Sequence, residues 1–215
     1  MSSFKWEPSL VKKGMIRHES TTLLTFQLRE DKNTPAGSVL FFGDSHIQGM
    51  AVSGITQLAS NFGIGHDTSA GLAKRIRKYD SIIKSRLVVV AIGQNDIGTV
   101  ANFKIIDNIE DIIKFVPPEI PILISGIFPL DTNLVNTPNT NKIISKLNTL
   151  LRDICSVDAR LHYLPPPHNF LTSEGNLRSE YHIGDGIHLN SGGNAVWVSK
   201  LQAQVEKIEQ VGRDE

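Results

Sequence analysis

The sequence has little cysteine, no surplus of charge of either sign and no long apolar run, and each shortage excludes a class of protein. Its one cysteine, Cys155, excludes an internal disulfide framework and is compatible with a reducing compartment. The 22 basic and 22 acidic residues balance, so we expect no binding of nucleic acid or of an anionic membrane. No segment approaches the length of a membrane span, and the N-terminus lacks the apolar core of a signal peptide. We therefore expect a soluble protein, cytoplasmic unless it is exported by another route.

The 215 residues fit one α/β domain that buries enough apolar surface to be stable alone. Five short apolar segments alternate with segments of helical periodicity, and the sequence contains no repeat and no low-complexity linker. This alternation predicts a doubly wound parallel sheet of about five strands, covered by helices on both faces in a three-layer α/β/α sandwich. The expected strands are 39–42, 59–65, 86–92, 120–126 and 161–164.

The expected helices are 47–58, 68–84, about 102–115, 139–157 and a final helix that Ser191 caps. In the second of these, Leu72, Ile76, Tyr79 and Ile83 follow helical spacing, and the basic residues between them, at 74–78, are interpreted as a solvated face. Cys155 lies in an apolar helical stretch and is interpreted as an inert, packed thiol.

Residues 1–37 are interpreted as an N-terminal extension packed on the single domain of residues 1–215. A short helix is expected there, followed by a loop that Pro35 and Gly37 close. Trp6 is interpreted as a packing residue.

The chain is organised around the stretch VLFFGDSHIQGM at 39–50. Four bulky apolar residues predict a strand buried on both faces, and Gly43 then permits a sharp turn. Ser45 is therefore expected at the C-terminal end of a central strand, where open α/β sheets bind their ligands. The alternative is that Asp44 or Ser45 only caps the helix that follows.

Polar residues follow four of the five expected strands. Ser45 follows the first strand, the pair Gly65–His66 the second, Asn95 the third, and Asp185 with His188 the fifth. Because the C-terminal ends of parallel strands lie on one edge of a sheet, these residues are expected to meet in one crevice.

The chemistry expected in this crevice follows from what each group can do. A serine needs a neighbouring base to become a nucleophile, and His188 has a carboxylate, Asp185, three residues before it. That carboxylate can fix the imidazole tautomer and stabilise the imidazolium. The backbone N–H of Ser45, that of Gly65 or His66, and the Asn95 amide can point at one developing oxyanion.

Four blocks of the sequence resemble the SGNH (GDSL-like) hydrolase family, in that family's order and over nearly the whole domain. They are GDS at 43–45, NFGIGHDTS at 61–69, GQND at 93–96 and DGIH at 185–188. The opening KWEP at 5–8, the segment 26–35 and the run HLNSGGNAVW after the last block are similar to its lysophospholipase-like and acetylhydrolase-like esterases. The resemblance implies a flavodoxin-like fold and ester hydrolysis without cofactor or metal.

The family's functional residues map onto four positions of this chain. The resemblance implies Ser45 as nucleophile, Asn95 as oxyanion donor, and Asp185 and His188 as the acid–base pair. The second block departs from the usual G-x-S-G-D-T, because His66 stands where the family's oxyanion glycine aligns. Either Gly65 or His66 can therefore supply the backbone donor.

The expected activity is removal of short acyl groups, acetyl in particular, from a small-molecule or glycan ester. A lysophospholipase or thioesterase acting on longer acyl chains is the alternative, because the substrate is not readable from the sequence. Tyr181 and His182, directly before the acid–base pair, are candidates for the substrate entrance, and the loop 165–184 for specificity.

Two other classes of protein match part of this pattern. A non-catalytic carbohydrate- or protein-binding module on this fold is one, but the intact set of reactive side chains disfavours it. A binuclear metallophosphoesterase is the other, because Asp44-Ser45-His46 matches that family's opening D-x-H motif. The later motifs of that family, GNH[DE] and G-H-x-H, are absent from the sequence.

Overall fold

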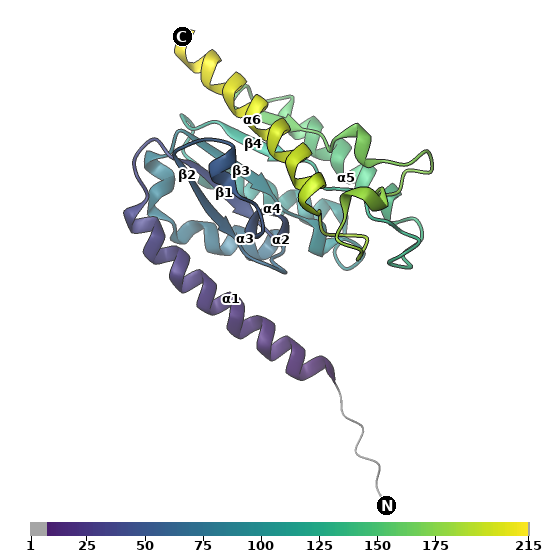
Figure 1. Ribbon diagram of the computed structural model, residues 1–215. Coiled ribbons are helices and arrows are strands. Elements are labelled where there is room, and N and C mark those ends of the chain that lie inside the picture. Colours follow the sequence, from purple (N-terminus) through teal and green to yellow (C-terminus); the bar gives the residue numbers. More distant parts are fainter. Residues whose placement is uncertain (1–7, 215) are drawn as a thin grey trace, which may run out of the picture.

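Five parallel strands form the single sheet of the computed structural model, which describes residues 8–214 and the side chains of 21–211. Trp6 and the KWE of the opening motif lie outside the described residues. The strands are β1 (Val39–Gly43), β2 (Ala59–Gly63), β3 (Leu87–Ala91), β4 (Ile122–Ser125) and β5 (Leu161–Leu164). Their order in the sheet is β2-β1-β3-β4-β5, so the doubly wound fold predicted from the sequence is confirmed (Figure 1).

The strand β1 lies between β2 and β3, and this position places Ser45 at the point where the strand order reverses. Phe42 pairs with Phe62 of β2 on one side and with Val90 of β3 on the other. All five residues of β1 are buried, as expected for a central strand that both layers cover.

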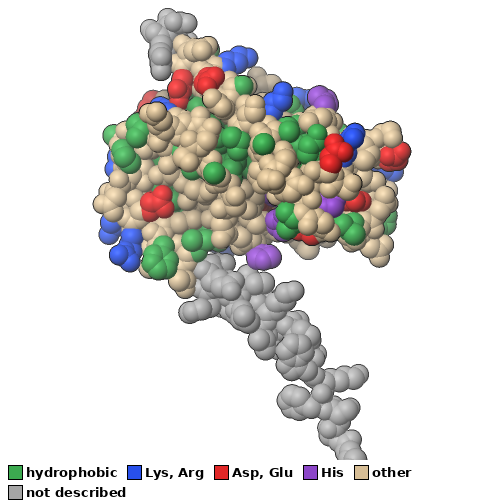
Figure 2. Space-filling model, in the orientation of Figure 1, with side chains coloured by type: hydrophobic (Ala, Val, Ile, Leu, Met, Phe, Trp, Pro, Cys, Tyr) green, Lys and Arg blue, Asp and Glu red, His purple; other side chains and the backbone are tan. Residues whose placement is uncertain are grey.

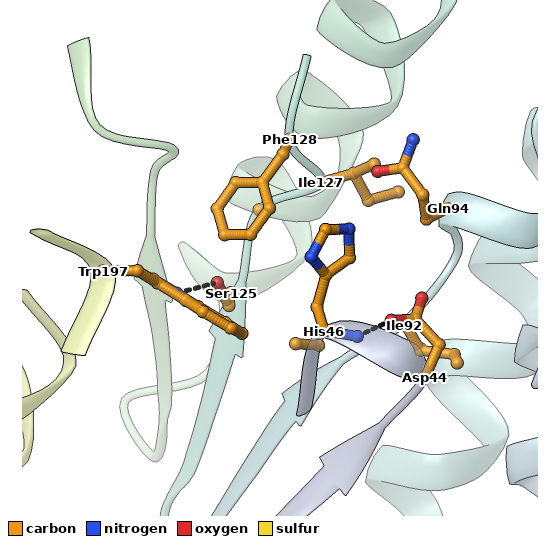
Figure 3. Close-up of a pocket in the computed structure, with 10 residues that line it drawn as sticks. Asp44, His46, Ile92, Gln94, Ser125, Ile127, Phe128 and Trp197 are labelled. Atoms are coloured by element: carbon orange, nitrogen blue, oxygen red, sulfur yellow. Dashed lines mark hydrogen bonds between the residues drawn. The ribbon is translucent and has the colours of Figure 1, made fainter. Parts of the chain in front are cut away.

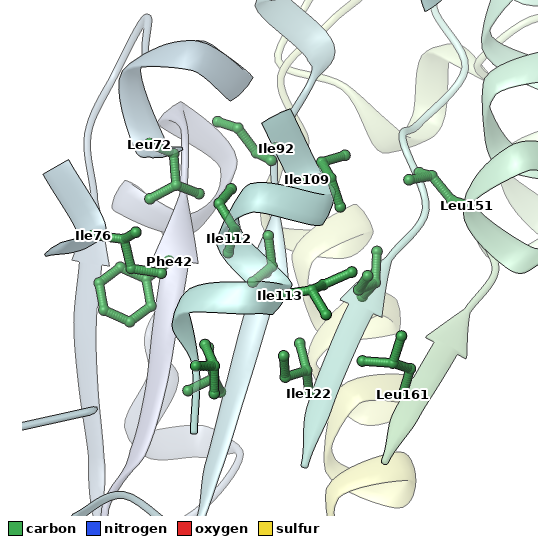
Figure 4. Close-up of a cluster of buried hydrophobic side chains, with 14 of the residues drawn as sticks. Phe42, Leu72, Ile76, Ile92, Ile109, Ile112, Ile113, Ile122, Leu151 and Leu161 are labelled. Carbon is green, nitrogen blue, oxygen red and sulfur yellow. The ribbon is translucent and has the colours of Figure 1, made fainter. Parts of the chain in front are cut away.

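The two faces of the sheet carry separate apolar cores, because successive side chains of a strand point to opposite faces. Leu40 and Phe42 face the core beneath α3 (Ser69–Arg75), α4 (Asn102–Phe115) and α5 (Thr140–Cys155), part of which Figure 4 shows. Val39 and Phe41 face the second core, which α6 (Ser191–Asp214) covers with Trp197 and Leu201. Helices therefore cover both faces, and the three-layer arrangement is confirmed.

The N-terminal helix α1 (Pro8–Asn33) is longer than the short helix expected from the sequence. Its C-terminal part lies against the domain through Leu24, Leu28 and the buried polar residues Gln27 and Asp31. Figure 1 shows the N-terminal turns of α1 projecting away from the sheet. Among the side chains of α1 that the structure describes, the packing contacts therefore run from Leu24 to Asp31.

Two helices expected from periodicity are much shorter in the structure. In place of 47–58 there is a four-residue helix, α2 (Ser45–Gln48), and a 3₁₀ turn at Val52–Gly54. The side-chain amide of Asn61 donates hydrogen bonds to the carbonyls of Ile47 and Met50, at 2.7 and 2.9 Å. Because these carbonyls are held by a neighbouring strand, α2 ends there.

The expected helix 68–84 divides into α3 and two 3₁₀ turns, Ile76–Lys78 and Asp80–Lys84. The chain becomes extended at Tyr79, and the Asp31 carboxylate of α1 accepts the next two backbone N–H groups, at 2.8 and 3.1 Å. The change of helical register buries Ile82 and leaves Ile83, predicted on the apolar face, 74 % exposed.

Further 3₁₀ turns occupy Gln94–Asp96, His168–Phe170 and Ser179–Tyr181. Acidic, basic and hydrophobic side chains are interspersed on the face drawn in Figure 2. Within residues 8–214, every helix is too short or too polar to cross a membrane. Cys155 is buried, and burial raises the pKa of its thiol to about 12, which fits the inert thiol that was predicted.

Candidate active site

Residues 43–48 form the turn that carries Ser45, the predicted nucleophile, and are called the nucleophile turn. Two glycines allow this turn to pack tightly against its neighbours. A Cβ on Gly43 would lie 2.2 Å from the carbonyl oxygen of Ala91, and one on Gly63 would lie 2.2 Å from the backbone nitrogen of Gln48. A side chain at either position would therefore push α2 and the adjacent strands apart. The buried Asp44 caps α2 by accepting the N–H of His46 at 3.0 Å. Because Asp44 fills the capping role, the hydroxyl of Ser45 is free for other contacts.

The structure brings Ser45, His188 and Asp185 into one hydrogen-bonded row. Ser45 Oγ lies 2.9 Å from His188 Nε2, and His188 Nδ1 lies 2.6 Å from Asp185 Oδ2. The serine is half-buried, while the side chains of His188 and Asp185 are 39 % and 36 % exposed. The row therefore lies at the surface end of the sheet, where a substrate can reach it.

The carboxylate of Asp185 stays ionised because its hydrogen bonds outweigh desolvation. Burial raises its pKa, but the imidazole of His188 and the backbone N–H groups of Ile187 and His188 all donate to it, and the net pKa is lowered. With Asp185 accepting at Nδ1, the neutral His188 carries its proton there. Its Nε2 is then the acceptor that faces the Ser45 hydroxyl.

The residues expected to form the oxyanion hole also gather at this edge of the sheet. Gly65 donates its backbone N–H to the side-chain oxygen of Gln48. His66 is left-handed, with φ 61°, which is the conformation that a glycine adopts most easily. Within the part of the chain that the structure describes, the backbone N–H of His66 has no acceptor. The amide of Asn95 donates one N–H to the carbonyl of Asp67 at 2.8 Å, and its second N–H makes no hydrogen bond within the described residues.

Arg75, which the sequence interpretation placed on a solvated face, is buried beside the site. Its Nε lies 2.7 Å from Asp67 Oδ2, and its two terminal nitrogens donate to Gly43 O and to Tyr79 Oη, at 3.1 and 3.0 Å. Burial raises the pKa of Asp67, and the ion pair with Arg75 lowers it. The effect of burial is larger, so the pKa of Asp67 lies above its usual value. The spacing of Arg75 from Leu72 and Tyr79 is the signal that could have placed it on the buried face.

His182, a sequence candidate for the substrate entrance, has a buried side chain. Its side chain is 4 % exposed, and its Nδ1 accepts the backbone N–H groups of Gly184 and Gly186. The ring is enclosed because the loop that carries Asp185 wraps around it. Tyr181 is half-buried, with its ring on Phe170 at a centroid distance of 5.0 Å and its hydroxyl accepting from Asn169.

A small cavity lies beside the nucleophile turn, and His46 fills one side of it. Figure 3 shows the ring of His46 beside Phe128 and Trp197, at centroid distances of 5.1 and 6.4 Å. The cavity measures about 20 Å³ and is bounded by Asp44, Gln94 and Ile127 as well, whereas neither Ser45 nor His188 lines it.

Burial controls the charge of both residues that flank Ser45. It lowers the pKa of His46 to about 4 and raises the pKa of Asp44 to about 7. These are the two side chains of the D-x-H motif that suggested a metallophosphoesterase. Among the described residues there is no group of three or more His, Cys, Asp or Glu side chains arranged to hold a metal ion.

One family model matches most of the chain. It is that of the GDSL-like lipase/acylhydrolase family, and the match covers residues 41–196, from β1 into α6. The matched residues include all three members of the hydrogen-bonded row. No curated protein sequence matches the chain.

Several solved structures share the fold. A Streptococcus pneumonia protein provisionally named a platelet activating factor superposes with a TM-score of 0.81 at 21 % identity, covering 90 % of this chain and 96 % of its own. A GDSL-like lipase from Bacteroides thetaiotaomicron gives 0.75 at 17 % identity, covering 86 % and 98 %. A catalytic mutant of the acetylxylan esterase Axe2 from Geobacillus stearothermophilus gives 0.65 at 16 % identity, covering 79 % and 95 %. At these identities the likeness establishes the fold alone.

Proposed function

Because the chain belongs to the GDSL-like lipase/acylhydrolase family, we propose that it hydrolyses carboxylic esters through an acyl-enzyme on Ser45. The observation that carries the proposal is the unbroken row from Ser45 Oγ through His188 to Asp185, with distances of 2.9 and 2.6 Å. This arrangement supports Ser45 as the nucleophile, His188 as the base and Asp185 as the group that orients it.

In the first half of the reaction the hydroxyl oxygen of Ser45 attacks the ester carbonyl carbon while its proton passes to His188 Nε2. The positive imidazolium that forms lies against Asp185, whose lowered pKa keeps it negative. Collapse of the tetrahedral intermediate breaks the bond to the alcohol oxygen, which leaves with the proton from His188. The acyl group then remains on Ser45.

In the second half a water molecule gives a proton to His188 and attacks the acyl carbon. The carboxylic acid product leaves when the Ser45 oxygen recovers the proton. Each intermediate carries a negative oxygen, which we assign to three N–H donors: the backbone of Ser45, the backbone of His66 and the free N–H of Asn95. The occupied N–H of Gly65 favours His66 over Gly65 in this role.

The acyl group is proposed to be short, acetyl in particular. The support is that an acetylxylan esterase is among the solved structures that share this fold, and that a small cavity lies between His46, Phe128 and Trp197, next to the nucleophile turn. The alcohol part is proposed to be a small molecule or a glycan. Hydrolysis of longer acyl esters, as by a lysophospholipase or thioesterase, is the competing activity.

The reaction is tested with Ser45→Ala and His188→Ala in p-nitrophenyl ester hydrolysis and in labelling by a fluorophosphonate probe. Both variants should fold and lose at least about a thousandfold in kcat, because the three residues act as a unit. Asn95→Ala should lose about a hundredfold, since it removes one oxyanion donor. Near-normal hydrolysis by Ser45→Ala would refute the assignment, and absence of labelling in wild type and variant alike would indicate a binding module.

The substrate is tested with esters of increasing acyl length, followed by acetylated sugars. The proposal expects kcat/KM to be highest for acetyl and to fall as the chain lengthens. A maximum at eight or more carbons would replace it with the long-chain activity.

A further inference from the structure

The ring of His182 is enclosed by the loop 182–188, which carries both Asp185 and His188. We propose that His182 is a positioning residue for the reaction: its neutral imidazole holds Asp185 in the place where it can orient His188. The inference rests on the proposed ester hydrolysis for its kinetic consequence, but its structural part can be tested without any substrate.

The first observation is that Nδ1 of His182 accepts two hydrogen bonds from the residues on either side of Asp185. The donors are the backbone N–H groups of Gly184 at 3.0 Å and Gly186 at 3.2 Å. Both glycines are left-handed, with φ of 100° and 75°, so the loop turns sharply at each of them. One nitrogen atom therefore holds both of the residues that flank Asp185.

The second observation is that the ends of the loop are closed by backbone contacts. The N–H of Ile183 donates to the carbonyl of His188 at 2.9 Å, and His182 pairs with Leu189 in an isolated antiparallel bridge. The N–H of Asp131 donates to the carbonyl of Gly186 at 2.9 Å. Between these closed ends, two acceptors hold the interior of the loop: Asp185 Oδ1 accepts the N–H groups of Ile187 and His188, and His182 Nδ1 accepts those of the two glycines beside Asp185.

The third observation concerns the other ring nitrogen. An Nδ1 that accepts two N–H groups is unprotonated, so the neutral ring carries its proton on Nε2. That Nε2 is buried and makes no hydrogen bond within the described residues. The charged group that faces it is Asp131, with Oδ2 at 3.7 Å. A buried N–H without an acceptor lowers the stability of the fold. The contacts of Nε2 therefore give no reason for a histidine at this position, whereas the two hydrogen bonds to Nδ1 do.

The two histidines of this loop therefore have opposite tautomers. His188 carries its proton on Nδ1, where Asp185 accepts it, whereas His182 carries its proton on Nε2. Without an acceptor at Nδ1 of His182, the N–H groups of Gly184 and Gly186 lose their partner and the turn relaxes toward water. Asp185 would then leave His188, and the imidazole would lose its orientation.

The test compares His182→Asn with His182→Leu. The side-chain oxygen of asparagine lies near the position of Nδ1 and can accept the same N–H groups, whereas leucine fills space without an acceptor. We expect His182→Leu to lose about 10- to 100-fold in kcat, as outer residues that orient a reacting group typically do. KM should change little because His182 does not reach the substrate, and His182→Asn should recover most of the loss.

A spectroscopic measurement separates this inference from the ester hydrolysis. Nitrogen-15 shifts of the imidazoles report each tautomer in the labelled wild-type protein, and we expect Nε2–H for His182 and Nδ1–H for His188. The His188 signal should be kept in His182→Asn and lost in His182→Leu. An Nδ1–H tautomer of His182 in the wild type overturns the inference, as does a folded His182→Leu with wild-type kcat or failure of asparagine to recover the loss.

Discussion

Arg75 and Asp67 form a buried ion pair, with Nε 2.7 Å from Oδ2, and this pair connects the two strand ends that carry Ser45 and Asn95. The same guanidinium donates to the carbonyl of Gly43, two residues before the serine. The backbone carbonyl of Asp67 accepts the amide of Asn95. Ser45 and Asn95, the proposed nucleophile and oxyanion donor, are therefore connected through one buried ion pair.

Replacing Arg75 should damage both stability and activity. Arg75→Met leaves the buried carboxylate of Asp67 unpaired, and removal of one partner of a buried ion pair costs about 3–5 kcal/mol. The loss is measured as the free energy of unfolding in urea. Arg75→Lys keeps the charge but loses the planar guanidinium group. Its free energy of unfolding should therefore lie between those of Arg75→Met and the wild type. A loss below about 1 kcal/mol for Arg75→Met would contradict the role of this ion pair.

His66→Gly should keep the activity and relieve the backbone. The variant retains the N–H proposed as an oxyanion donor, and glycine adopts φ 61° without the penalty of about 1–2 kcal/mol that a Cβ brings. Since glycine also loses more entropy on folding, the expected gain is about 0–1 kcal/mol in the free energy of unfolding. His66→Ala is the control, because it keeps the Cβ and removes the imidazole. A tenfold loss of kcat in both variants would show instead that the imidazole contacts the substrate.

The stability of the protein should depend on pH through two buried groups that oppose each other. Burial raises the pKa of Asp44 from its usual 3.8 to about 7, so the folded state resists ionisation and becomes less stable as pH rises from 4 to 7. Burial lowers the pKa of His46 from 6.5 to about 4, so the folded state resists protonation and becomes more stable as pH rises from 4 to 6.5.

Asp44→Asn separates these two effects. The asparagine oxygen still accepts the N–H of His46, but the residue no longer ionises. The free energy of unfolding should therefore rise more steeply between pH 4 and 6.5 in the variant than in wild type. In His46→Leu, the free energy of unfolding should instead fall between pH 4 and 6.5, relative to the wild type, because only the effect of Asp44 remains. Parallel urea-unfolding curves at pH 4, 5, 6 and 7 for all three proteins would show that neither group is buried as described.

Phe128→Leu should change the preference for acyl length. Phe128 packs on His46 and on Trp197, at centroid distances of 5.1 and 4.9 Å, and borders the small cavity. The smaller side chain enlarges that space, so the ratio of kcat/KM for butyryl to acetyl esters should rise by about tenfold, the lower end of the roughly 10- to 200-fold that one methylene can be worth in a pocket. Exposed Phe103, replaced by leucine, serves as the control. An unchanged ratio would place the acyl group elsewhere.

The apolar pattern identified the strands well because a central parallel strand must be apolar on both faces. Leu87–Ala91 lies within the expected segment 86–92, and Val39–Gly43 exceeds the expected 39–42 by one residue. The helices after the first two strands were predicted too long, because periodicity does not reveal side chains that interrupt a helix from outside. The Asn61 amide donates to the carbonyls of Ile47 and Met50, where α2 ends. The Asp31 carboxylate caps the turn that follows Tyr79.

The interpretation of single side chains failed where burial was at issue. Arg75 sits in a basic cluster that resembles a solvated face, yet it is buried because Asp67, Gly43 and Tyr79 supply acceptors for its guanidinium. His182 precedes the acid–base pair, yet its ring points into the loop because Gly184 and Gly186 fold around it.

The sequence by itself determined the layered parallel sheet, since alternating apolar strands and amphipathic helices leave few other ways to bury their surfaces. It also determined which residue types stand at the strand ends, and hence the class of chemistry. Only the tertiary structure decided which N–H groups are free, which charges are buried and which nitrogen of each histidine carries the proton. These properties depend on partners distant in the chain, because a hydrogen bond or a buried charge is satisfied by whatever atom the fold brings within about 3 Å.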